Sequence, residues 1–183
     1  MASCMSKQFA KALIYAAMTI GFLVFVLVYH GGMHKTDQID VSYFQAQRFL
    51  FLAGAVMLGF GISLRRHLPS DALFLSLLGG ALLIAFLVMF VLFGGLSGTF
   101  DATGYAAANA QLVLLDGAAI ACFVRCAVLS AGLRDAVPAQ RWTARLICTA
   151  LAVLMVCLII TGSATRFVQY DEAVSEGYGY SEY

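Results

Sequence analysis

Charged residues and prolines are both scarce in this sequence, and each scarcity limits what the chain can be. Only 11% of its 183 residues are Asp, Glu, Lys or Arg, whereas a soluble domain carries about a quarter. Two prolines leave long stretches in which a helix would not be interrupted. The formal net charge is +1, and no basic cluster with interleaved aromatic residues lies outside the apolar segments. These features exclude an ordinary soluble domain and a nucleic-acid partner.

Sequence motifs of common catalytic and metal sites are also missing. The chain has no phosphate-binding loop, no GxGxxG fingerprint, no GxSxG nucleophile elbow and no HExxH. His30 and His34 are four residues apart, but the glycines between them favour a helix end over a metal site. The five cysteines form no CxxC, and four of them lie in apolar segments, where they act as small packing residues. We therefore expect no enzyme, no metal and no cofactor.

What the sequence has in excess is apolar residues, which make up 62% of the chain and fall into blocks. A helix needs about 20 such residues to cross roughly 30 Å of hydrocarbon. Five blocks meet this length, at about 12–29, 44–64, 72–96, 106–133 and 142–164. The predicted fold is all-α, a polytopic helix bundle of about five transmembrane helices over residues 1–166, and the protein is expected to be a multi-pass integral membrane protein in the lipid bilayer. Residues 167–183 are acidic and rich in tyrosine, and we expect a flexible tail there.

The distribution of Lys and Arg predicts the orientation of the bundle. With five spans, seven basic residues fall on one side of the membrane and three on the other. The larger group is Lys7, Lys11, Arg65, Arg66, Arg134, Arg141 and Arg145, and the smaller is Lys35, Arg48 and Arg166. Cytoplasmic loops carry the excess of positive charge. We therefore expect the N-terminus inside and the C-terminus outside.

The fourth block contains two opposite charges, Asp116 and Arg125. Arg125 falls near the inner boundary, where a long side chain can extend to the headgroups. Asp116 falls near the bilayer midplane, where an acid costs about 2.5–3.5 kcal/mol to insert. It has two interpretations: a polar clasp that hydrogen-bonds another helix, or a proton- or cation-binding residue. The neighbouring polar side chains that could assist it are Asn109, Gln111 and Arg48.

Small residues in the same block predict close helix packing. Ala118, Cys122, Cys126 and Ser130 repeat every four positions, and Gly117 and Ala121 form a second row beside them. Small residues at this spacing let helix backbones approach closely in lipid. The second block offers a shorter example, Ala55 and Gly59.

Together these features predict a non-enzymatic structural or accessory subunit that works through lateral helix–helix contacts. The partner would be a second copy of the chain or a larger membrane complex, reached through the small-residue face of the fourth block. The alternative is a small transporter or channel subunit in which Asp116 binds a proton or cation.

Overall fold

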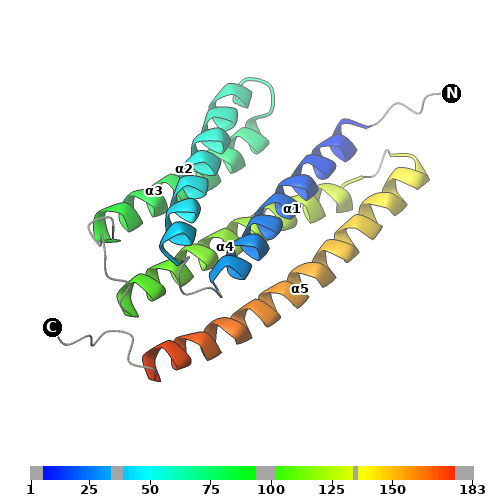
Figure 1. Ribbon diagram of the computed structural model, residues 1–183. Coiled ribbons are helices and arrows are strands. Elements are labelled where there is room, and N and C mark those ends of the chain that lie inside the picture. Colours follow the sequence, from blue (N-terminus) through cyan, green and yellow to red (C-terminus); the bar gives the residue numbers. More distant parts are fainter. Residues whose placement is uncertain (1–5, 34–38, 94–101, 134–135, 176–183) are drawn as a thin grey trace. The chain divides into compact units, whose positions relative to one another are not determined.

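The chain forms five α-helices in a computed structural model that describes residues 6–33, 39–93, 102–133 and 136–175 (Figure 1). Side chains are described for residues 6–28, 47–91, 110–133, 136–158 and 160. The helices are α1 (Lys7–Met33), α2 (Ile39–Leu64), α3 (Pro69–Phe93), α4 (Ala102–Ala131) and α5 (Pro138–Ser175). The described residues contain no strand.

Each helix contains a stretch that is long and apolar enough to cross a membrane. The five stretches are Lys7–Val28, Gln47–Leu64, Pro69–Val91, Ala110–Ala131 and Pro138–Leu158. This confirms the predicted all-α class with five apolar helices. Their length and composition indicate an integral membrane protein.

The helices extend beyond the apolar blocks. The thickness of the hydrocarbon core sets how long the apolar segment must be, but backbone hydrogen bonds can continue the helix past that segment. α1 continues through Gly31 and Gly32 to Met33, although these glycines favour a helix end in the sequence. α5 runs to Ser175, well into the segment after Arg166 that is expected to be a flexible tail. No proline or glycine lies between Arg166 and Ser175 to stop the helix.

Both prolines of the chain begin a helix. Pro69 is the first residue of α3 and Pro138 the first residue of α5. Proline is favoured there because its fixed φ suits a helix and its missing N–H would have no intrahelical acceptor. Asp71 adds an acid to the first turn of α3, where the helix dipole favours negative charge.

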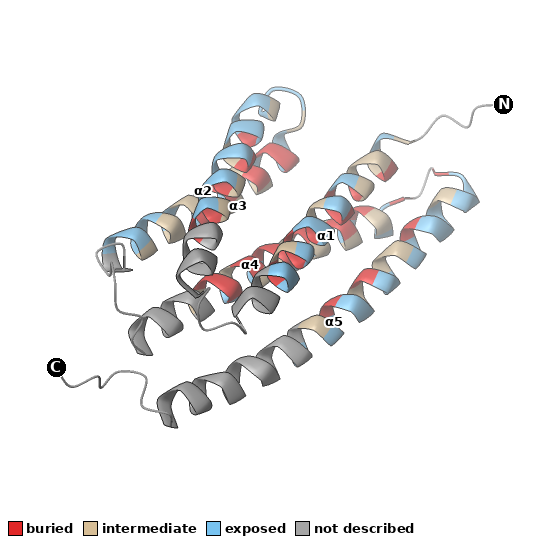
Figure 2. Ribbon diagram, in the orientation of Figure 1, coloured by how far each residue is buried: buried red, intermediate tan, exposed pale blue. Residues whose placement is uncertain are grey.

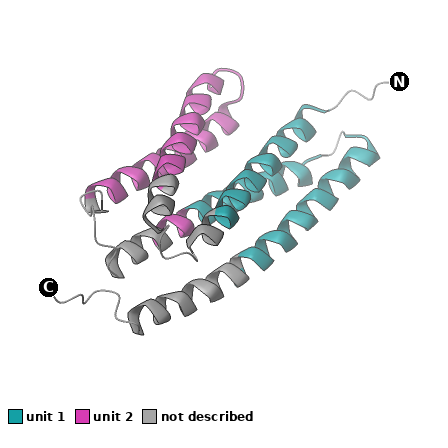
Figure 3. Cartoon of the chain, in the orientation of Figure 1, with its two compact units in different colours: residues 1–28, 115–165 teal, residues 29–114, 166–183 magenta. Residues whose placement is uncertain are grey.

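The chain divides into two compact units (Figure 3). Unit 1 consists of Met1–Val28 and Leu115–Thr165, and therefore holds most of α1, the second half of α4 and most of α5. Unit 2 consists of Tyr29–Leu114 and Arg166–Tyr183, and holds α2, α3 and the first half of α4. α4 is thus a single helix shared by both units.

Four of the helices bury a narrow row of residues that alternates spacings of three and four (Figure 2). The rows are Phe9, Ala12, Ala16, Thr19, Leu23 and Val26 in α1; Gln47, Leu50, Gly54, Met57 and Gly61 in α2; Ala72, Leu75, Gly79 and Leu82 in α3; and Leu112, Leu115, Ala119, Cys122, Cys126 and Leu129 in α4. This spacing is the seam of left-handed helix packing. The remaining faces stay apolar and exposed, as lipid requires.

In unit 2, α2 and α3 approach each other closely where glycines lie on both seams. A Cβ atom built on Gly79 would lie 2.5 Å from the Leu58 backbone nitrogen and 2.7 Å from the Gly54 carbonyl oxygen. A Cβ on Gly54 would in turn meet the Gly79 carbonyl oxygen at 3.0 Å. Such backbone contact needs residues without side chains.

Two further contacts extend the α2–α3 interface along the helices. A Cβ on Gly61 would collide with Ser76 of α3. The rings of Phe51 and Phe86 pack with their centroids 5.2 Å apart. The interface therefore combines close backbone approach with an aromatic contact.

In unit 1, the beginnings of α1 and α5 pack around one buried apolar cluster. Phe9 of α1 and Ala144 of α5 belong to it, together with Leu133 and Ala136 from the connection between α4 and α5. Leu13 packs against the cluster. α1 and α5 therefore begin at the same end of the unit.

Candidate functional site

Asp116 lies at the midpoint of α4, fourteen residues after Ala102 and fifteen before Ala131. At 1.5 Å per residue, each end of the helix is about 21–23 Å away. Its side chain is half-buried. The carboxyl group is therefore kept from both helix ends by several turns of apolar sequence.

Gln111, one and a half turns before Asp116, is fully buried. Neither its amide nitrogen nor its amide oxygen has a hydrogen-bond partner among the described residues. An unsatisfied buried polar group costs about 1–3 kcal/mol. Five residues turn a helix by about 500°, so Gln111 and Asp116 lie on different faces of α4. Among the candidate polar side chains that are described, Gln111 is the most deeply buried.

Of the other two polar candidates, one has no described side chain and the other is exposed. The side chain of Asn109 lies outside the described residues. Arg48 belongs to α2 and is exposed, so it is not part of a buried polar group. Arg125 is half-buried six residues before the end of α4, about 9 Å from that end.

The row of small residues on α4 is mostly internal to unit 1. Ala118, Cys122 and Cys126 are buried, each at most 2% exposed, and Ser130 is half-buried. A larger side chain at Cys122 would therefore disturb the chain's own packing before it reached any partner. A substitution at Cys122 would thus test folding and not association.

The second small-residue row behaves differently. Gly117 is exposed, and no atom lies within 4 Å of the place where its Cβ would be. Ala121 is half-buried. Gly117 therefore leaves an open notch in the surface of α4.

Ala55 and Gly59 of α2 are also exposed, and a Cβ on Gly59 would meet no atom within 4 Å. The α2 glycines that contact α3 are Gly54 and Gly61, on a different face. The spacing of four on α2 therefore does not identify the face that packs against α3. The residues of that face alternate spacings of three and four.

Cys148 is a packing residue that the sequence analysis did not single out. Its Sγ lies 3.8 Å from Cys126 Sγ and donates to Ser130 Oγ at 3.4 Å. These contacts join α4 to α5 through weak polar interactions. Nothing in the local sequence around Cys148 indicates them, since the two thiols are 22 residues apart.

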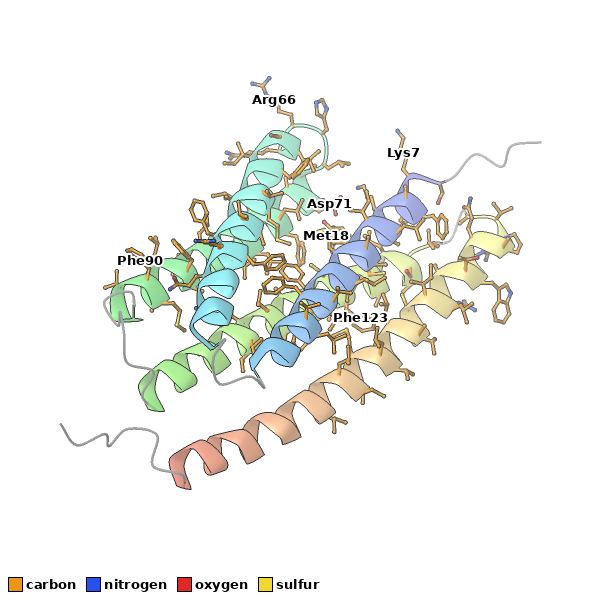
Figure 4. All side chains as sticks on the ribbon, in the orientation of Figure 1. Lys7, Met18, Arg66, Asp71, Phe90 and Phe123 are labelled. Carbon is orange, nitrogen blue, oxygen red and sulfur yellow. The ribbon has the colours of Figure 1, made fainter. Side chains whose placement is uncertain are left out.

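Three more polar side chains are buried: Thr19, Gln47 and Asp71 (Asp71 is labelled in Figure 4). The hydroxyl of Thr19 has a partner within its own helix, because it donates to the Tyr15 carbonyl one turn earlier at 2.9 Å. Within the described part of the chain, no three His, Cys, Asp or Glu side chains lie close enough to hold a metal ion.

Comparisons with protein families, with curated proteins and with solved structures found no match for this chain.

Proposed function

We propose that this protein is a non-enzymatic, multi-pass structural or accessory subunit that binds a second copy or a larger membrane complex through lateral helix contacts. The observation that carries the proposal is the open notch at Gly117 in the middle of α4. The proposed orientation places the N-terminus inside and the C-terminus outside.

The face of α4 around Gly117 is suited to receive another helix. Val113, Ile120 and Val124 lie on the same face and are exposed at 61%, 42% and 52%. In lipid, helix association depends on close packing and on hydrogen bonds, because both lipid and helix surfaces are apolar. Gly117 permits a close backbone approach, and half-buried Asp116 beside it can supply a polar contact at the same depth. This combination favours a helix partner over lipid alone.

Replacing Gly117 with leucine is expected to weaken association at least tenfold, which corresponds to about 1.4 kcal/mol. The new side chain occupies the notch, because a Cβ at residue 117 meets no atom outside α4 within 4 Å. The mass of the complex extracted in mild detergent, measured by native mass spectrometry across a dilution series, gives the result.

Gly59→Leu is the matched control, because Gly59 is also an exposed glycine with open space beside it, but on α2. It should leave the mass of the complex unchanged. A wild-type chain that is always a lone monomer would contradict the proposal, and so would an assembly that tolerates Gly117→Leu.

The second candidate function is a transporter or channel subunit in which Asp116 binds a proton or cation. Gln111 favours it, because a fully buried amide without a described partner is a costly feature for a purely structural helix. Residues that carry such a cost are often functional in membrane helices.

For this second function, Asp116→Asn is expected to abolish proton or cation flux into liposomes, because the amide cannot ionise. Gln111→Leu should reduce the flux and at the same time stabilise the fold by about 1 kcal/mol, since it removes an unsatisfied amide. The exposed Arg66→Gln serves as a charge-change control. Flux that is the same with either residue at position 116 would exclude this mechanism. A clasp, in contrast, should tolerate Asp116→Asn, because the new amide still forms hydrogen bonds.

A further inference from the structure

The first two turns of α1 and of α5 carry the same unfavourable charge pattern. Lys7 and Lys11 begin α1, and Arg141 and Arg145 begin α5, in each case four residues apart. Like charges at this spacing are neighbours on the helix surface and repel each other. Positive charge near a helix N-terminus is also opposed by the helix dipole. The two charges of each pair therefore repel each other, and the dipole also opposes the one in the first turn, Lys7 in α1 and Arg141 in α5.

Neither α1 nor α5 has an acid in its first turn, whereas α3 has Asp71 there. The sequence of unit 1, residues 1–28 and 115–165, contains two acidic residues, Asp116 at the midpoint of α4 and Asp135 three residues before α5 begins. It contains six basic residues, which are Lys7, Lys11, Arg125, Arg134, Arg141 and Arg145.

The two basic pairs lie at the same end of unit 1. Phe9, between the two lysines, belongs to the same buried cluster as Ala144, which lies between the two arginines. Lys7 extends from the first turn of α1 (Figure 4), and both arginines are exposed. If the five helices cross the membrane, this end meets one headgroup layer.

The arginine pair of α5 has the features of a phosphate site. Arg141 and Arg145 form one exposed ridge, and the Nε of Arg141 donates to the Ala136 carbonyl at 3.0 Å, which holds its stem near the start of α5. Trp142 is 72% exposed beside them. Tryptophan is enriched at the level of lipid headgroups, and guanidinium groups bind phosphate through paired hydrogen bonds.

We propose that Arg141, Arg145 and Trp142 form a binding site for the phosphate of an anionic phospholipid, in the leaflet at which α1 and α5 begin. The lipid phosphate supplies a negative charge beside the two arginines. Because tryptophan is enriched at the depth of lipid headgroups, we assign the phosphate to a lipid. The site does not depend on whether the chain is a subunit or a transporter.

Trp142 is the one tryptophan of the chain, so its fluorescence reports on this site directly. The full-length protein is reconstituted in vesicles that contain either brominated phosphatidylglycerol or brominated phosphatidylcholine at equal mole fraction. Bromine quenches a neighbouring indole, so the bound lipid is the one that quenches. We expect phosphatidylglycerol to quench more strongly, with a relative affinity about fivefold higher for each arginine that contacts it.

Arg141→Gln/Arg145→Gln should remove this preference. Because Arg141 also bonds to Ala136, Arg145→Gln alone is the second variant, and it should lower the preference about fivefold without that disturbance. Arg65→Gln/Arg66→Gln is the matched control, since it removes the same charge from two exposed arginines of unit 2, and it should keep the preference.

Equal quenching by the two lipids in the wild type would overturn the proposal, as would a preference that survives in Arg145→Gln and in the double variant. Inorganic phosphate distinguishes the remaining source. It should reduce the preference no more than chloride does at the same ionic strength. A larger reduction by phosphate would overturn the assignment to a lipid.

Discussion

Gly79→Ala is expected to force α2 and α3 apart, whereas Gly80→Ala is expected to leave them in place. A Cβ at residue 79 would lie 2.5 Å from the Leu58 backbone nitrogen and 2.7 Å from the Gly54 carbonyl oxygen. Backbone atoms cannot move aside as a flexible side chain can, so the helices must separate. A Cβ at residue 80 meets nothing within 4 Å.

The two variants should therefore differ in the sign of their effect. Overpacking at residue 79 should lower the free energy of unfolding by about 1–3 kcal/mol. Alanine at residue 80 should be neutral or stabilising by up to about 1 kcal/mol, because alanine has the higher helix propensity. Thermal and denaturant unfolding in the same detergent, followed by circular dichroism, measures both.

A second pair of nearby glycines repeats the comparison on the other helix. Gly61→Ala should destabilise the chain through its collision with Ser76, and Gly59→Ala should not. If Gly79→Ala and Gly80→Ala gave the same stability, the close approach of α2 and α3 would be wrong.

Oxidation is expected to join α4 to α5 through Cys126 and Cys148, and in near-complete yield. Their sulfur atoms are already 3.8 Å apart, and a disulfide needs about 2.05 Å. Iodine, which enters lipid, takes up the two electrons of the two thiols and leaves a disulfide and two equivalents of hydrogen iodide. A protease site inserted between residues 134 and 135 separates α4 from α5 along the chain, so a cross-link keeps the two fragments together on a non-reducing gel.

Three variants make this test specific. Cys126→Ser and Cys148→Ser should each abolish the cross-link, because each removes one partner. Cys157→Ser should preserve it, since Cys157 is an exposed thiol further along α5. Fragments that separate fully after oxidation of the wild type, or a cross-link that persists without Cys148, would contradict the packing of α4 against α5.

The candidate site was predicted only in part. Asp116 stands out in the sequence because an acid within an apolar block has a high insertion cost. Its position at the midpoint of α4 follows from helix length alone. The burial of Gln111 and the exposure of Arg48 could not be predicted, because both depend on which face of each helix meets a neighbour.

The residues at which helices pack could also be predicted only in part from the sequence. The spacing of four on α2 indicated Ala55 and Gly59, but the structure packs Gly54 and Gly61 against α3 and leaves the indicated pair exposed. On α4 the same kind of row proved mostly buried, while Gly117 beside it is open. A row of small residues therefore identifies a helix surface that can be approached closely, without saying whether the chain itself makes that approach.

The number of helices and the approximate length of their apolar stretches could be predicted from sequence alone, because about 20 apolar residues are needed to cross hydrocarbon. The helix starts at Pro69 and Pro138 are also local in origin, since proline suits the first turn of a helix. The tertiary structure alone decided which face of each helix is buried. In a soluble protein that face is the apolar one, but in a membrane helix the buried and the exposed faces are both largely apolar, so hydrophobicity does not distinguish them. Which face is buried then depends on shape, on the backbone contact between Gly54 and Gly79, and on the contact between the thiols of α4 and α5. These contacts form only when the helices are side by side.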